Sequence, residues 1–128
     1  MPTFPVVTGD IVTSTIWNGL PAFEVATDKT TDYTAVSGDQ YQQLIPMNKA
    51  TAIAFKIPTN ATYAFPVGTV ITVLNKGAGT CTISAVTSGT TSILSAGATA
   101  ASPTLGQYKS AACIKTATDT WYVVGAIA

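Results

Sequence analysis

The sequence contains no histidine and no arginine, and its charged side chains are six lysines and six acidic residues among 128 residues. Charged residues make up 9% of the chain, against about 25% in an average soluble domain. The net charge is zero, so we expect no basic patch that would bind a phosphate backbone and no nucleic-acid partner. Histidine is the most frequent general base and metal ligand, so its absence argues against an enzyme and against a metal or other cofactor.

Long apolar runs and an export signal are also missing from the sequence. No run of about 18 apolar residues occurs, so we expect no membrane span. Residues 1–5 (MPTFP) lack the basic start of a secretory signal, which favours synthesis in the cytoplasm. Cys81 and Cys113 could form one disulfide, but in a reducing compartment they would be small buried apolar side chains, and we favour the second interpretation.

What the sequence does contain is typical of a folded β protein. Apolar residues reach 47%, and the chain has 11 aromatic residues with many valines, isoleucines and threonines, a composition unlike that of disordered chains. With so few charges, the surface is either a coat of threonine, alanine and serine or is largely covered by other subunits. We expect burial in an assembly.

Short β-patterns separated by turn residues fill the chain from about residue 40 onward. In residues 51–57 (TAIAFKI) apolar and small or polar residues alternate, as in a half-buried strand. Residues 69–75 and 80–86 flank a glycine-containing loop and predict a hairpin. Residues 108–116 and 121–125, joined by a turn at 117–120, predict another. No repeat of fixed length is visible.

These patterns, without a long amphipathic helical segment, predict an all-β fold: a single antiparallel β-sandwich or barrel, jelly-roll-like, over residues 40–128. Residues 1–39 are predicted to be an extended N-terminal arm and lead-in, because prolines and glycines interrupt an apolar segment there. A tryptophan on such a segment is the type of residue that anchors protein interfaces. The predicted partner-binding residues of the arm are Phe4, Val6, Val7, Ile11, Val12, Ile16 and Trp17.

Candidate chemical groups give no convincing active or metal site. The carboxylates of Glu24, Asp28, Asp32 and Asp39 lie among threonines and lysines in a segment that we expect to be solvated, with no reason for a raised pKa. The cysteines lack the paired spacing of zinc ligands. Five of the aromatic residues could together stack on a sugar, although core and interface packing is the interpretation that we favour. These residues are Tyr41, Tyr63, Tyr108, Trp121 and Tyr122.

Two parts of the chain resemble structural proteins of tailed bacteriophages. Residues 9–20 (GDIVTSTIWNGL) are similar to the opening of many virion proteins of this class. Residues 65–71 (FPVGTVI) and 75–80 (NKGAGT), continued by 112–115 (ACIK) and 120–125 (TWYVVG), resemble β-rich domains of phage fibres, head fibres and capsid decoration proteins. The likeness covers about half of the chain, and it implies an architectural role without catalytic residues.

The size of the chain favours one of these roles. One domain with an arm, without a repeated shaft or heptads, suits a capsid decoration (cement) protein on the capsid surface of the virion. The resemblance then implies a homotrimer whose partner is the major capsid protein. The alternative is a short head or tail fibre, or an adaptor, that binds a host receptor or glycan, and a small cytosolic enzyme is the least favoured class.

Overall fold

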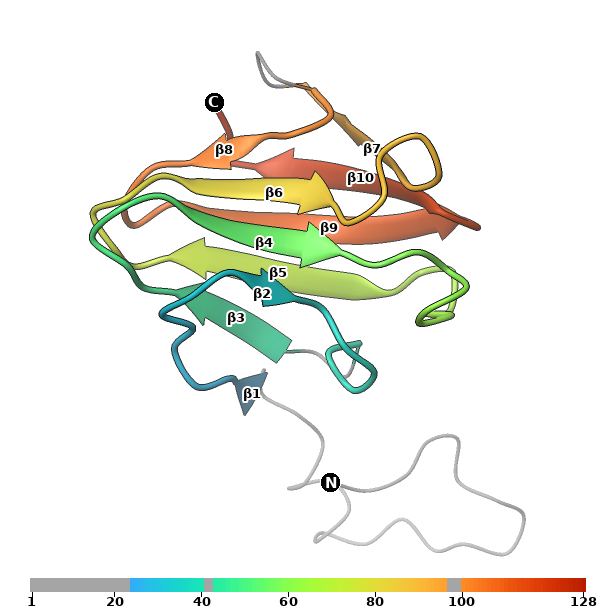
Figure 1. The fold of residues 1–128 in the computed structure, drawn as a ribbon, viewed down its shortest axis with the longest axis horizontal. Coiled ribbons are helices and arrows are strands. Elements are labelled where there is room, and N and C mark those ends of the chain that lie inside the picture. Colours follow the sequence, from blue (N-terminus) through green and yellow to red (C-terminus); the bar gives the residue numbers. More distant parts are fainter. Residues whose placement is uncertain (1–23, 41–42, 97–99) are drawn as a thin grey trace, which may run out of the picture.

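The computed structural model describes residues 24–40, 43–96 and 100–128, and every regular element in them is a β-strand (Figure 1). The prediction of an all-β fold is confirmed. Among these residues no helix is long and apolar enough to cross a membrane. The strands are β1 (Glu24–Val25), β2 (Tyr33–Thr34), β3 (Gln43–Met47), β4 (Ile53–Ile57), β5 (Val70–Asn75), β6 (Cys81–Ala85), β7 (Ser92–Ser95), β8 (Thr104–Leu105), β9 (Ser110–Ala117) and β10 (Thr120–Gly125).

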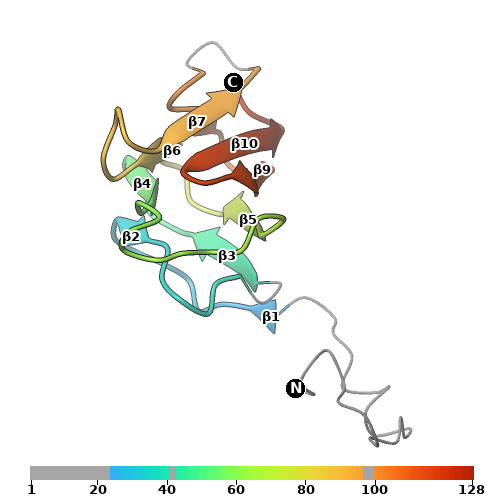
Figure 2. The ribbon, with the colours of Figure 1, turned by 90° about the vertical axis from the view of Figure 1, so that its right-hand side faces the viewer.

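The strands form two sheets that lie face to face (Figure 2). The six-stranded sheet has the order β1-β3-β5-β9-β10-β7, and the four-stranded sheet has the order β2-β4-β6-β8. Residues 24–39, which the sequence places in the lead-in of the arm, supply β1 and β2, an edge strand of each sheet. The side chains between the sheets form one core, in which Trp121 meets Phe65 edge-on at 5.8 Å between ring centroids.

The prediction that the strands are antiparallel is wrong, because both sheets are mixed. Five strand pairs are parallel and three are antiparallel. Four of the parallel pairs join successive strands of one sheet. The chain crosses to the other sheet between them, so both strands start from the same end. Of the three antiparallel pairs, β9 with β10 is joined by a hairpin.

The predicted hairpin of residues 69–75 and 80–86 is one of these crossings. β5 lies in the six-stranded sheet and β6 in the four-stranded sheet, so the loop between them is an arch. An equivalent arch joins β3 to β4 directly beside it. Ile45 pairs with Val73 in one sheet and Phe55 pairs with Ile83 in the other, a spacing of 28 residues in both cases. Residues 43–57 and 71–85 are therefore two stacked coils of equal length.

Glycines allow the two arches to lie against each other. The Gly79 nitrogen donates a hydrogen bond to Lys49 O (3.0 Å), and a β-carbon on Gly79 would overlap the main chain of Thr51. A β-carbon on Gly77 would likewise overlap the main chain of Lys49. The arch between β5 and β6 therefore needs glycine at both positions for close approach.

Two of the predicted elements agree with the structure. The alternating segment 51–57 contains β4, in which Ile53, Phe55 and Ile57 are buried. The last predicted hairpin is β9 and β10, which pair antiparallel. Its turn includes Asp119 with a φ of 52°, a left-handed conformation.

Candidate functional site

The predicted partner-binding residues of the arm, Phe4, Val6, Val7, Ile11, Val12, Ile16 and Trp17, lie outside the described residues. Their role stays a prediction. Candidate sites can be assessed on the two-sheet domain, where three features stand out: the outer face of the six-stranded sheet, a cavity beside β7, and a buried polar network.

The outer face of the six-stranded sheet carries two rows of mainly apolar side chains. Strand register aligns the first row across four strands and the second across five. We call these positions the apolar face. The first row is Val70, Ile114, Tyr122 and Leu94, and the second is Val25, Leu44, Thr72, Ala112 and Val124.

Several side chains of the apolar face are well exposed. Val25 is 65% exposed, Val124 52% and Tyr122 45%. None of the nine residues of the face is charged, and the lysine of β9, Lys115, points inward and is buried. Exposed apolar side chains scattered singly are ordinary on a protein surface, but contiguous apolar patches mark interaction sites.

The outer face of the four-stranded sheet is different in character. Register again aligns two rows, and most of their side chains carry a hydroxyl or a charge. The rows are Thr34, Lys56 and Ser84, and Ala54, Thr82 and Thr104. Since both sheets belong to one domain, the contrast indicates that the apolar face is the side of the domain suited to contact with a protein.

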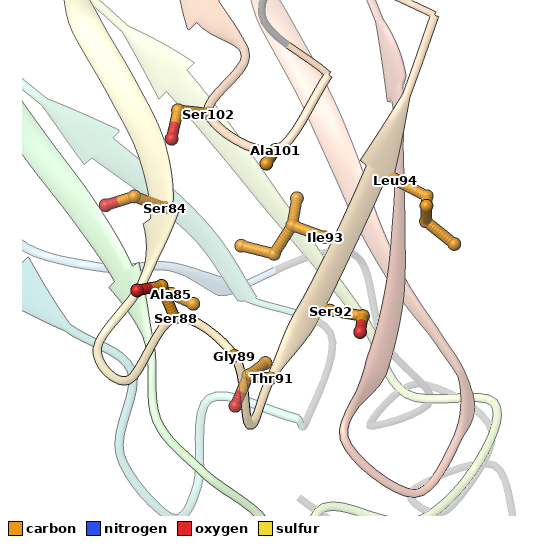
Figure 3. Close-up of a pocket in the computed structure, with 10 residues that line it drawn as sticks. All are labelled: Ser84, Ala85, Ser88, Gly89, Thr91, Ser92, Ile93, Leu94, Ala101 and Ser102. Carbon is orange, nitrogen blue, oxygen red and sulfur yellow. The ribbon is translucent and has the colours of Figure 1, made fainter.

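A cavity of about 310 Å³ lies between the end of β6, the start of β7 and residues 101–102 (Figure 3). Ile93 points into it from β7 (Figure 3). Its hydroxyl-bearing residues are Ser84, Ser88, Thr91, Ser92 and Ser102. Hydroxyl groups around an apolar residue can bind an uncharged polar ligand, but the lining includes no acid, lysine or cysteine.

A buried polar network joins the connection between β4 and β5 to the last hairpin. The Lys115 Nζ donates hydrogen bonds to Asn60 Oδ1 and to Phe65 O, both at 2.6 Å. The Asn60 nitrogen donates to Asp119 Oδ1 (2.7 Å), which also accepts from Thr91 Oγ1 (3.2 Å). Because these side chains bind across from one segment to another, the network holds the connection between β4 and β5 against the last hairpin. No local pattern predicts a buried lysine here, since Lys115 lies in a strand of otherwise ordinary composition.

The two cysteines are buried and unbonded, in agreement with the favoured interpretation. Burial raises the pKa of the Cys81 thiol to about 11 and that of the Cys113 thiol to about 12. Both thiols are therefore neutral and poorly nucleophilic at pH 7. Within the described residues no group of three potential ligands could hold a metal ion.

The four carboxylates singled out in the sequence do not share a site. Asp28 binds Lys76 Nζ at 2.9 Å, and the hydrogen bonds from Lys76 and Asn48 lower the pKa of Asp28. Asp32 accepts from the Ala54 nitrogen at 2.9 Å. Asp39 is buried and accepts from Tyr33 OH at 2.8 Å.

Glu24 lies on the edge strand β1 and is exposed. Burial of the Tyr33 ring and the hydrogen bond from its hydroxyl to Asp39 together raise the pKa of Tyr33. Asp28, Asp32 and Asp39 thus each stabilise a different local contact.

The aromatic residues weighed as a sugar-binding surface are spread over the domain. Trp121 is in the core and Tyr122, its neighbour in β10, is on the apolar face. Tyr63 packs near Phe65, close to the start of β5. Tyr108, 78% exposed, binds Asn75 O at the end of β5 through its main-chain nitrogen. Tyr41 lies outside the described residues.

The apolar face was missed in the sequence, although β10 contains a signal for it. Residues 121–124 are four consecutive apolar residues (WYVV). Such a run is typical of strands covered on both faces, whereas a half-buried strand alternates.

Comparisons with known proteins add no relative. No protein-family model, no curated protein and no solved structure matches this chain.

Proposed function

We propose that this chain is a non-enzymatic virion structural protein, a capsid decoration (cement) protein of a tailed phage. In this proposal the domain is a β-sandwich with an extended N-terminal arm, and it acts as a homotrimer that binds the major capsid protein. The observation that carries it is the place where the apolar segment joins the domain. In the sequence this segment precedes β1, the edge strand of the six-stranded sheet, where Val25 is 65% exposed.

An arm attached at a sheet edge gives a simple mechanism of reinforcement. The domain stays outside the shell while the apolar residues of the arm, Trp17 foremost, contact neighbouring capsid subunits. Each contact adds buried surface that must be exposed again before the subunits separate. A ligand that binds only the assembled state stabilises it by mass action, so the shell resists internal pressure better.

The test is attachment of Trp17→Ala to particles from which the protein has been stripped. We expect a loss of affinity of at least about tenfold, because aromatic anchors dominate interface energies, with the thermal unfolding midpoint of the domain unchanged. Tyr108→Ala is the matched control, since Tyr108 is an exposed aromatic residue of the domain. Attachment that survives Trp17→Ala unchanged would contradict the role of the arm.

The cavity beside β7 favours a second candidate, a short head or tail fibre or an adaptor that binds a receptor or glycan. Its hydroxyl-bearing lining and Ile93 suit an uncharged polar ligand such as a sugar. In that case Ser88→Ala would reduce adsorption to host cells while the capsids remain stable. The copy number in purified particles separates the candidates: hundreds of copies favour decoration, and a few at one vertex favour a fibre or adaptor.

A further inference from the structure

We propose that the apolar face is the surface through which copies of this chain associate with one another. The proposed function includes a homotrimer but does not say which surface forms it. This inference rests on that self-association and names the surface. The core of the contact is the row Val70, Ile114, Tyr122 and Leu94, with Val124 beside it in the second row.

The charge pattern favours a second copy as the occupant. An interface between identical chains around a symmetry axis brings like surfaces together, so a charge near the axis meets its own kind. The apolar face has no charged residue and avoids this repulsion, whereas the outer face of the four-stranded sheet would bring Lys56 of each copy together. The apolar face can therefore pack against the same face of a second copy without charge repulsion, whereas the outer face of the four-stranded sheet would bring like charges together.

The size of the face suits a modest contact. Its nine positions each cover about 4.8 Å across the sheet and about 6.6 Å along the strand, which gives a face of roughly 300 Å². Two such faces bury about 600 Å² in total, the size of a weak, reversible contact. The apolar face alone therefore supports an association that depends on concentration.

Tyr122 is suited to be the anchor of this contact. It lies between Ile114 of β9 and Leu94 of β7 in the same row, so apolar side chains surround it in the sheet. Tyrosine combines a large apolar ring with a hydroxyl that can find a hydrogen-bond partner, and such residues are enriched among the hot spots of interfaces. Trp121, the other large aromatic of β10, is buried in the core and unavailable.

The experiment is sedimentation equilibrium of the full chain across a range of concentrations, with variants of both sheet faces. We expect an oligomer for the unmodified protein, and a dissociation constant raised by at least about 100-fold in Tyr122→Glu/Val124→Glu, because association would bury unpaired charges. The matched control is Thr82→Glu/Thr104→Glu on the outer face of the four-stranded sheet, and we expect it to associate like the unmodified chain.

Three results would overturn the proposal. They are a monomer at every concentration, a face variant that still associates, and a control that dissociates as far as the face variant. If Tyr122→Glu/Val124→Glu does not fold by circular dichroism, hydroxyl-radical labelling of the unmodified protein decides. Labelling of Tyr122 must fall at high concentration while that of Tyr108 stays constant, and equal labelling of Tyr122 at both concentrations rejects the interface.

Attachment to stripped particles is scored separately, so that the two proposals fail differently. A monomer that attaches to particles would overturn this inference and leave decoration standing. An oligomer that dissociates on Tyr122→Glu/Val124→Glu but does not attach would overturn decoration and leave this inference standing.

Discussion

The Asn75 side chain at the end of β5 donates a hydrogen bond from Nδ2 to Leu105 O at 2.8 Å, and so joins the six-stranded sheet to β8 of the four-stranded sheet. The same Nδ2 donates to Gly79 O (2.8 Å), and Oδ1 accepts from the Gly77 nitrogen (3.1 Å). Asn75 is fully buried, so water cannot replace any of the three partners. One amide therefore holds the arch between β5 and β6 in place.

Removal of this amide should be costly. We expect Asn75→Ala to lower the free energy of unfolding by about 2–4 kcal/mol, because it leaves several buried main-chain groups without partners. The measurement is urea denaturation followed by tryptophan fluorescence. Asn48→Ala is the control, since the exposed Asn48 side chain binds only exposed Asp28 and should change stability by less than about 0.5 kcal/mol. Equal losses in both variants would contradict the role of Asn75.

Substitution of Gly79 tests the packing of the two arches. A β-carbon there would overlap the main chain of Thr51, which cannot move aside as a flexible side chain would. We expect Gly79→Ala to destabilise the domain by about 3 kcal/mol or more. Gly106→Ala is the comparison, because its β-carbon would meet only the Lys109 side chain at 3.7 Å. Chemical denaturation of both variants checks the prediction, and a Gly79→Ala protein as stable as Gly106→Ala would refute it.

The buried thiols predict a loss of stability at high pH. In the fold the pKa is about 11 for Cys81 and about 12 for Cys113, against 9.0 for the ordinary thiol. Well below pH 9.0 the two thiols are protonated in both the folded and the unfolded state, so they do not change the stability. Above it the unfolded state releases protons first, so the free energy of unfolding falls as pH rises toward the folded pKa values. The limit is about 1.4 kcal/mol per pH unit for each thiol.

Denaturation curves between about pH 8 and pH 10 measure this effect below most of the titration of tyrosines and lysines. The variant Cys81→Ala/Cys113→Ala serves as the control. It should be less stable at neutral pH because of the cavities left, but its stability should change much less over this range. If its pH dependence equals that of the unmodified chain, the thiols are not the cause.

Asp119 combines an unusual backbone with two side-chain contacts. Its φ of 52° is tolerated by asparagine and aspartate better than by alanine. Asp119→Asn keeps both the conformation and an acceptor for the Asn60 nitrogen, so we expect a change below about 1 kcal/mol. Asp119→Ala loses both, and we expect a loss of about 2 kcal/mol. Thermal unfolding of the two variants tests this, and the reverse order of stability would contradict it.

The sequence predicted the elements of this fold better than their connections. The alternation of β4 and the turn of the last hairpin are local features, and both were predicted correctly. The arch between β5 and β6 was taken for a hairpin because two β-runs around a glycine loop look the same in both cases. What distinguishes them is that Gly77 and Gly79 contact Lys49 and Thr51, about 28 residues earlier in the chain, and no local pattern contains that information.

The apolar face was likewise only partly predictable from the sequence. The consecutive apolar residues of β10 could have indicated a strand covered on both faces. Their alignment with Leu94 and Val70 depends on β7 and β5 lying on either side of the last hairpin. That order follows from the parallel crossings, which the antiparallel prediction did not allow. A row of side chains built from four strands is visible only after the strands have been ordered.

The position of the last hairpin also sets an order of events in folding. β7 pairs within its sheet only with β10, whose paired residues follow 28 residues later, while β9 and β10 insert between β5 and β7. Residues 43–85 can stack as they emerge from the ribosome, but β7 has no partner until residues 110–125 have been synthesised. Pairings distant in sequence form slowly and leave strand edges open meanwhile. Until then Ile93 and Leu94 are apolar side chains on a strand that lacks its partner in the sheet.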